Sequence, residues 1–208
     1  MTGLRAKQKA QRRALIEKAA SALFVEKGFA DTAIEEIAER AMVSAPTVYN
    51  YYGTKGDLLL ALVARGEEGI LDAENDFSKQ TKNYAPVDLV TKVIHSNVHD
   101  TISSLSRELW GHVVAFVATA TDPDVGPRYL DTIAGGLSAA IERVVMRYIE
   151  EGAFRSGVDA KELADLLTRM ERIHFLNFVY LKNMPESKLD ENIAKDVKAI
   201  VGALLVEK

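Results

Sequence analysis

The chain has 208 residues, of which 48% are hydrophobic and 27% are charged, values close to those of soluble globular proteins. That balance excludes intrinsic disorder and predicts one or two domains with a substantial core. The sequence contains no cysteine, which excludes disulfides, a thiolate nucleophile and cysteine-ligated metal sites. Neither a signal-peptide pattern nor a run of 18 apolar residues is present, so we expect a cytoplasmic protein with no membrane span.

The net charge of −4 is unevenly distributed along the chain. Residues 1–55 carry nine Lys and Arg against six Asp and Glu, whereas residues 56–208 carry 17 against 24. Five positive charges and no acid lie in the first thirteen residues, namely Arg5, Lys7, Lys9, Arg12 and Arg13. A basic N-terminal segment on an acidic body indicates a polyanionic partner for the N-terminus alone, although a solvated tail has the same composition.

Apolar residues recur at helical spacing along the chain, which predicts an all-α fold of about nine helices. A first helix is expected over residues 6–27, with Gly28 ending it. Thr32 would cap a second helix, because Glu35 lies three residues further on and completes a capping box. That helix is expected to end near Ala41.

The third and fourth helices are predicted from their capping residues. Ser44 would be the N-cap of a third helix of about seven residues, with Pro46 in its first turn and Gly53 at its end. Thr54 and Asp57 would cap a fourth, leucine-rich helix. Later helices are expected at about residues 86–104, 106–121, 127–151, 159–182 and 190–206.

Two short capped helices with a tight turn, beside a basic segment, predict a DNA-binding helix-turn-helix. On the third helix, Val48 and Tyr52 are four residues apart and are expected to pack inward. The N-terminal tip of a recognition helix meets base edges in the major groove. There Ala45 and Pro46 would make apolar contacts, and Asn50 would pair with adenine.

Hydroxyls, helix N-termini and an ammonium near this helix are suited to phosphate contacts. We expect such contacts from Thr32, Ser44, Tyr49 and Lys55, with Thr47 and Tyr51 completing the exposed face. Capping alone is the alternative role for Thr32 and Ser44. Core packing is the alternative role for Tyr49 and Tyr51. Because few long polar side chains reach the bases, shape readout and the arm at residues 5–13 are expected to supply much of the specificity.

The stretch from Thr32 to Lys55 closely resembles the TetR family of bacterial transcriptional regulators. The matching positions are Thr32, Ile37, Ala38, Ala41, Val43, Ser44, Thr47, Tyr49, Tyr51 and Lys55. The likeness is specific over residues 10–65, and elsewhere it is one of length and helical pattern. Met42 replaces the turn glycine, at a cost on the order of 1 kcal/mol if the turn needs a positive φ. Pro46 stands where glycine is common.

The resemblance implies a helix-turn-helix DNA-binding domain at residues 1–53 and an effector-binding and dimerisation domain at 54–208. It implies a homodimer through the last two helices, whose apolar faces would serve, and hence a palindromic operator in double-stranded DNA. The implied function is ligand-responsive regulation, expected to be repression relieved by a small hydrophobic or amphiphilic effector. An enzyme is not expected, nor is a cofactor or metal.

Candidates for the effector pocket are aromatic, histidine and large apolar residues, each of which could equally be ordinary core: His95, Trp110, Val114, Met146, Met170, His174 and Phe175. Gly66 and Gly69 interrupt the fourth helix and are expected to ease the tilt by which ligand acts on the recognition helices. His95 and His99 share one helix face at i, i+4, which leaves open a metal-responsive regulator or a small helical enzyme. A third possibility is that the basic N-terminal segment binds another protein.

Overall fold

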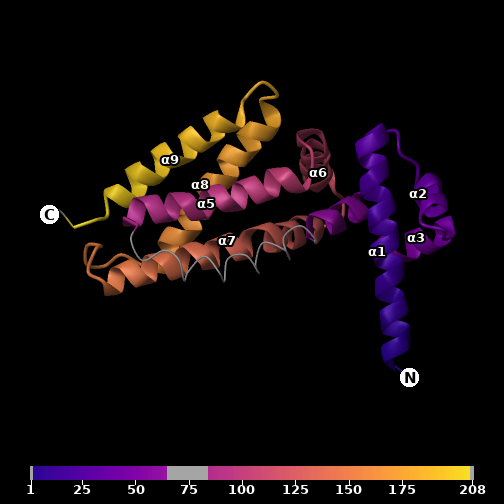
Figure 1. Ribbon diagram of the computed structural model, residues 1–208, viewed down its shortest axis with the longest axis horizontal. Helices are drawn as coiled ribbons and strands as arrows, with labels where there is room; N and C mark the ends of the chain where they lie inside the picture. The colour runs from indigo at the N-terminus through magenta and orange to yellow at the C-terminus, as the bar shows by residue number, and fades with distance from the viewer. Residues whose placement is uncertain (1, 65–83, 207–208) are drawn as a thin grey trace. The chain divides into compact units, whose positions relative to one another are not determined.

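A computed structural model describes residues 2–64 and 84–206, and their regular structure is helical apart from one isolated β-bridge (Figure 1). The expected all-α class is therefore confirmed. The helices are α1 (Thr2–Lys27), α2 (Ile34–Arg40), α3 (Ala45–Tyr52), α5 (Pro86–Ser104), α6 (Arg107–Thr119), α7 (Val125–Glu150), α8 (Ala160–Tyr180) and α9 (Glu186–Gly202). Residues 55–64 are also helical. Gly66 and Gly69 lie outside the described residues. None of the helices described is long and apolar enough to cross a membrane.

The chain forms two compact units. The first comprises Met1–Arg65 and Leu105–Val125, and the second comprises Gly66–Ser104 and Gly126–Lys208. The helix-turn-helix therefore shares a unit with α6, which is distant in sequence. The boundary expected after residue 53 falls inside the first unit, so that division remains a proposal about function rather than a description of the packing.

The core of the first unit forms where α2 and α3 lie against the C-terminal half of α1 (Figure 1). The apolar side chains that α1 buries recur every three or four residues, as one face of a helix requires. They are Ile16, Ala19, Ala20, Leu23 and Phe24. Opposite them, Ile37 of α2, Val48 of α3 and Leu58 of the following helix are also fully buried.

Gly56, near the start of the helical segment 55–64, lets α6 approach closely. A Cβ atom placed on Gly56 would clash with the ring of Phe116 on α6, so this contact depends on the absence of a side chain. A second contact stacks Phe29 on His112 of α6, with ring centroids 4.9 Å apart. Trp110 of α6 is buried as well. Thus α6 completes the core of the first unit.

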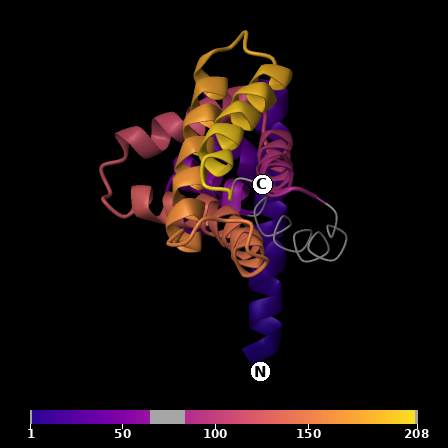
Figure 2. The ribbon, with the colours of Figure 1, turned by 90° about the vertical axis from the view of Figure 1, so that its left-hand side faces the viewer.

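In the second unit, α9 packs against α5 and α8, and Figure 2 shows α9 lying along α8. The shared core is apolar and is drawn from α5, α7, α8 and α9. Its fully buried members include Val90, Ile94, Val98, Leu137, Ile141, Val145, Ala164, Leu167, Leu189, Ile193, Val197 and Val201.

The segment after α9 is joined to the loop between α7 and α8 by an antiparallel β-bridge between Phe154 and Leu205. The Arg155 N–H donates to the Leu204 carbonyl at 2.9 Å, and the Val206 N–H donates to the Ala153 carbonyl at 3.0 Å. These backbone bonds fix the end of α9 beside the start of α8.

Candidate nucleic-acid interface

The turn between α2 and α3 is a complete Schellman motif. After the C-cap Ala41, Met42 has φ of 55°. Its N–H donates to the Glu39 carbonyl at 3.0 Å, and the Val43 N–H donates to the Ala38 carbonyl at 2.9 Å. This pattern requires a left-handed residue, usually glycine, in the first position beyond the cap. The positive φ suspected at Met42 is therefore confirmed, and its side chain is 86% exposed.

The start of α3 agrees with its expected capping residue. Ser44 is the N-cap, and Pro46 lies in the first turn, where the missing N–H costs nothing. The Ser44 hydroxyl is 2.8 Å from the Thr47 hydroxyl and makes no bond to a backbone N–H of the helix. Val48 and Tyr52 are buried as expected. Two buried positions four residues apart fix which face of α3 remains outside.

The other face of α3 is accessible to a partner. Ser44, Pro46, Tyr49 and Asn50 are exposed, whereas Ala45, Thr47 and Tyr51 are half-buried. Hydroxyl, amide and apolar groups thus stand together over about two turns of helix. Groups of these kinds make phosphate and base-edge contacts in the major groove.

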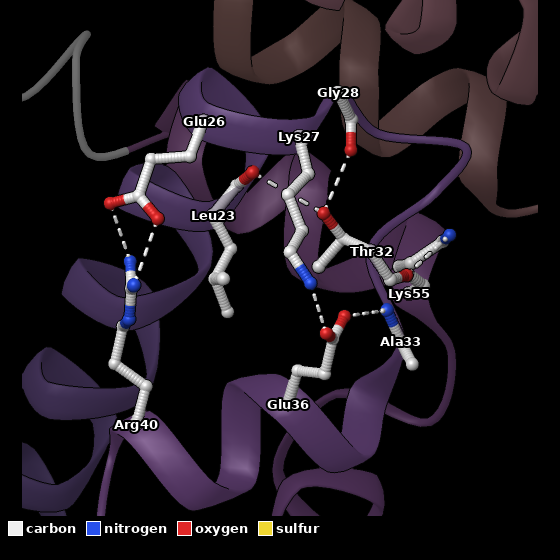
Figure 3. Close-up of polar contacts among 9 residues, drawn as sticks. All are labelled: Leu23, Glu26, Lys27, Gly28, Thr32, Ala33, Glu36, Arg40 and Lys55. Atoms are coloured by element: carbon white, nitrogen blue, oxygen red, sulfur yellow. Dashed lines mark hydrogen bonds and ion pairs between the residues drawn. The ribbon is translucent and has the colours of Figure 1, made fainter.

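Thr32 does not cap α2, so the expected capping box with Glu35 is wrong. The N-cap is Ala33, and its N–H donates to the Glu36 carboxylate at 3.1 Å. The Thr32 side chain is 2% exposed. Its hydroxyl donates to the Gly28 carbonyl at 2.7 Å, with the Leu23 carbonyl at 3.3 Å (Figure 3). The hydroxyl thus closes the end of α1, and a phosphate contact would require it to leave the Gly28 carbonyl.

Lys55 is bound inside the first unit. Its ammonium donates to the carbonyls of Phe29 at 2.7 Å, Ala30 at 3.1 Å and Thr32 at 2.9 Å. It also lies 4.6 Å from the centre of the Phe29 ring. An ammonium has three donors, and all three are used here. Lys55 therefore holds the loop between α1 and α2, and a phosphate contact would require it to release a carbonyl.

Two ion pairs fix α2 to the end of α1, and neither was foreseen from the sequence. Arg40 donates to both carboxylate oxygens of Glu26, at 2.7 and 2.8 Å, and Lys27 pairs with Glu36 (Figure 3). Both pairs are exposed to solvent, where screening leaves an ion pair little effect on stability. Their value is positional, because they set the orientation of α2 on α1.

A buried carboxylate connects α1 to α3. Glu17 is 5% exposed, and its Oε1 accepts from Nε of Arg13 and from the hydroxyl of Tyr52, each at 3.0 Å. Burial raises the pKa of Tyr52, and the Glu17 charge raises it further. The hydrogen bond from Arg13 to Glu17 also raises the pKa of the guanidinium. The sequence carries a signal for the i, i+4 pair of Arg13 and Glu17 but none for Tyr52.

The residues expected to line an effector pocket fall in both units. Trp110 and Val114 lie on α6 of the first unit, and the others lie in the second. Trp110 and Phe175 are buried, Met146 is exposed, and Met170 packs against the core of the second unit. His174 lies 2.8 Å from a carboxylate oxygen of Asp196, and His95 contacts Asp190. That the seven residues share one pocket remains a prediction.

One open cavity of about 670 Å³ lies in the second unit. It is lined by the loop between α7 and α8, by the first turns of α8 and by Leu204. None of the seven expected effector residues lines it.

The histidine pair of α5 faces Asp190 of α9. Nε2 of His99 lies 3.1 Å from a carboxylate oxygen of Asp190, and Nε2 of His95 lies 3.1 Å from its backbone carbonyl. In residues 2–64 and 84–206, no group of three or more His, Cys, Asp or Glu side chains is arranged to hold a metal ion.

The N-terminal segment matches one family model and one curated protein. Residues 16–62 match the family model for bacterial regulatory proteins of the tetR family. Over 61 residues the chain is 36% identical to the HTH-type transcriptional activator FasR of Mycolicibacterium smegmatis. That match covers 29% of this chain and only 28% of the curated relative.

Solved structures resemble the chain over nearly its whole length. FadR of Thermus thermophilus, a TetR-family transcriptional repressor in complex with lauroyl-CoA, is 22% identical, with a TM-score of 0.74 and coverage of 94% of this chain and 96% of that chain. FadR of Bacillus subtilis in complex with stearoyl-CoA is 16% identical, with a TM-score of 0.63 and coverage of 92% and 98%. A TetR transcription regulator from Haloarcula marismortui is 19% identical, with a TM-score of 0.65 and coverage of 95% and 100%. These likenesses show a shared fold.

Proposed function

We propose that this chain, which belongs to the tetR family of bacterial regulatory proteins, is a dimeric transcriptional repressor that a small effector releases from a palindromic operator. Members of the family are transcriptional regulators rather than enzymes. The observation that carries the proposal is the exposed face of α3, which presents Tyr49 and Asn50 while Val48 and Tyr52 hold the helix from behind. A partner in bacterial DNA implies that the protein works in the cytoplasm.

In the proposed complex, α3 enters the major groove with its N-terminal end foremost. Asn50 would pair with an adenine, and Ala45 and Pro46 would contact apolar groups such as a thymine methyl. Ser44, Thr47, Tyr49 and Tyr51 would lie near the phosphates or the groove wall. Replacing Asn50 with alanine is then expected to cost about 1–3 kcal/mol of discrimination at one operator position. A variant that kept the wild-type base preference at every position would contradict this assignment.

A dimer is supported by an apolar stripe that the isolated chain leaves exposed on α8. Leu166, Ile173 and Tyr180 recur every seven residues and are 44%, 58% and 60% exposed. Side chains at this spacing lie along one side of a helix, and an exposed apolar row of this kind is typical of an interface between chains. We propose that α8 and α9 pair with their copies in a second chain.

The dimer is tested with Ile173→Glu, which places a charge in the proposed interface. We expect the mass in solution to fall from dimer to monomer. Val25→Glu is the matched control, because Val25 is 74% exposed in the first unit and its replacement should leave the mass unchanged. If Ile173→Glu remained a dimer, as Val25→Glu should, and both variants kept wild-type stability, the assignment of this face to the interface would be wrong.

We propose an amphiphilic effector with a long apolar part, and acyl-CoA thioesters are the first class to test. The two FadR structures support this choice, since their ligands are lauroyl-CoA and stearoyl-CoA. The seven expected effector residues remain candidates for its site. Lauroyl-CoA, coenzyme A and laurate should be compared as ligands that release the protein from its operator. Release by none of the three would exclude this ligand class.

A metal-responsive regulator is the less favoured function. The expected metal site consists of two histidines, His95 and His99, and both already contact Asp190. Metal analysis of the purified protein distinguishes the two proposals, because a stoichiometric metal ion would favour this one.

The main experiment is the selection of bound sequences from a random duplex pool, followed by measurement of affinity against salt concentration. A palindromic consensus with half-sites one helical turn apart, about 34–36 Å, or a multiple of it, is expected. Weak binding without a consensus would contradict sequence-specific DNA recognition. The sign of regulation is then read from a reporter carrying the selected operator, since the relative FasR is named an activator.

A further inference from the structure

The N-terminal turns of α1 extend beyond the core of the first unit. The helix begins at Thr2, but the first buried residue among its described side chains is Ile16. At 1.5 Å per residue, the intervening turns are about 20 Å long. Residues 6–13 are all exposed, and Figure 1 shows this end of α1 running past α3. Such an extension would not be helical alone in water, so it continues the helix that the core nucleates.

Of the basic residues in this extension whose side chains are described, Lys9 and Arg12 lie on one face of α1, and it is the face that packs on α2 and α3. At 100° per residue, Lys9 and Arg12 align with Ile16 and Leu23, which are buried in the first unit. Lys7 lies on the opposite face, nine residues before Ile16. The helical register therefore places Lys9 and Arg12 on one face of α1 and Lys7 on the other, which the sequence composition alone does not reveal.

Arg13, which follows Arg12 in the chain, contacts α3. Its Nε pairs with Glu17, and its guanidinium lies 5.8 Å from the centre of the Tyr52 ring. Because Tyr52 belongs to α3, α1 lies beside that helix at the turn that follows Lys9 and Arg12. No acidic residue precedes Glu17 in the sequence, so nothing local neutralises Lys9 and Arg12.

We propose that Lys9 and Arg12 form a helical phosphate clamp, which grips the DNA backbone beside the bases that α3 reads. This proposal rests on the proposed function, since it needs a duplex seated on α3. A duplex is a rod that continues past the end of α3, and the clamp stands on the same side of α1 as that helix. Phosphate contacts carry no base information. The clamp thus lengthens the footprint and strengthens binding while the consensus stays unchanged, so Lys9 and Arg12 would supply affinity rather than the specificity expected of the arm at residues 5–13.

The clamp is tested by single charge removal in the full-length protein, with the selected operator in a long duplex. Lys9→Gln and Arg12→Gln should each lower the slope of log affinity against log salt by about 0.9, the value for one phosphate contact in B-DNA. Lys18→Gln is the matched control, because Lys18 is exposed on the opposite face of α1 and should leave the slope unchanged. Circular dichroism verifies that each variant keeps its helix content.

A second arm of the experiment shortens the duplex until it ends at the outermost base of the consensus. On this duplex the wild type and Lys9→Gln should bind with equal affinity and equal salt slope, because the flanking phosphates are gone. A Lys18→Gln loss equal to that of Lys9→Gln would mean a general charge effect and would overturn the clamp. A changed consensus for Lys9→Gln would overturn it as well, since it would indicate base contact.

The two proposals fail in different ways. If the wild type selects no consensus and binds no duplex, the proposed function is wrong. If the wild type selects a consensus but the three variants share its salt slope, only the clamp is wrong.

Discussion

The hydroxyl of Tyr52 on α3 donates a 3.0 Å hydrogen bond to the buried carboxylate of Glu17 on α1. The same oxygen accepts from Arg13. One carboxylate thus joins α3 to α1, the helix that carries the basic extension.

Tyr52→Phe removes this hydrogen bond and keeps the ring. Hydrogen bonds to charged groups are worth about 1.5–3 kcal/mol, so we expect a loss of about 2 kcal/mol in the free energy of unfolding, measured with urea. Tyr49→Phe is the control, because its hydroxyl is at an exposed position and its loss should change stability little. Equal effects from the two variants would show that the Tyr52 bond contributes nothing specific.

The raised pKa of Tyr52 predicts a loss of stability in alkali. The phenol of an unfolded chain ionises near pH 10, whereas burial keeps the folded phenol protonated to a higher pH. The native state therefore holds more protons above about pH 10, and stability falls as pH rises towards the folded pKa. The measurement is the difference in unfolding free energy between wild type and Tyr52→Phe from pH 8 to pH 11. It should be constant at first and then shrink, and a constant difference throughout would contradict the shift.

Met42→Gly should stabilise the turn of the helix-turn-helix. The left-handed conformation costs a residue with a side chain about 1–2 kcal/mol, and part of the gain is lost because glycine is freer in the unfolded chain. We expect a net gain of about 1 kcal/mol in thermal or urea unfolding. Met42→Ala should bring no such gain, since alanine retains the Cβ atom. A gain from alanine equal to that from glycine would locate the effect in the exposed thioether instead.

Gly56→Ala should destabilise the first unit, because the new methyl group meets the Phe116 ring. Overpacking of this kind costs about 1–3 kcal/mol. Gly111→Ala on α6 is the control, since nothing lies within 4 Å of a Cβ atom there and alanine is the better helix former. Adding Phe116→Ala to Gly56→Ala should cost less than the two single changes together. Strict additivity would mean that the two residues are not in contact.

The local signals of the sequence succeeded where a cap or turn is satisfied by its own neighbours. Thr54 and Asp57 form the expected reciprocal box, with the Asp57 N–H donating to the Thr54 hydroxyl at 3.0 Å and the Thr54 N–H donating to the Asp57 carboxylate at 3.1 Å. Gly28 ends α1 with a positive φ, and Ser44 begins α3. In each case the partners lie within four residues of one another.

The same reasoning did not find the partners of side chains that a distant group binds. Thr32 fits a capping pattern, but its hydroxyl is taken by carbonyls at the end of α1. Lys55 fits a family position, yet three carbonyls of the loop before α2 occupy its ammonium. The contact between Gly56 and Phe116 joins residues sixty positions apart, and no periodicity reports it. Helix positions were thus predictable, whereas the partners of buried polar groups were not.

The placement of α6 has a consequence for exchanging parts between regulators. A fragment cut after residue 64 would carry the whole helix-turn-helix yet lose the cover that α6 gives to Phe29 and Gly56. It would expose apolar surface in the free fragment and invite aggregation. A chimera that joins residues 1–64 to the remainder of another protein must therefore include α6 as well. Otherwise the recipient must offer a helix with an aromatic ring opposite Gly56.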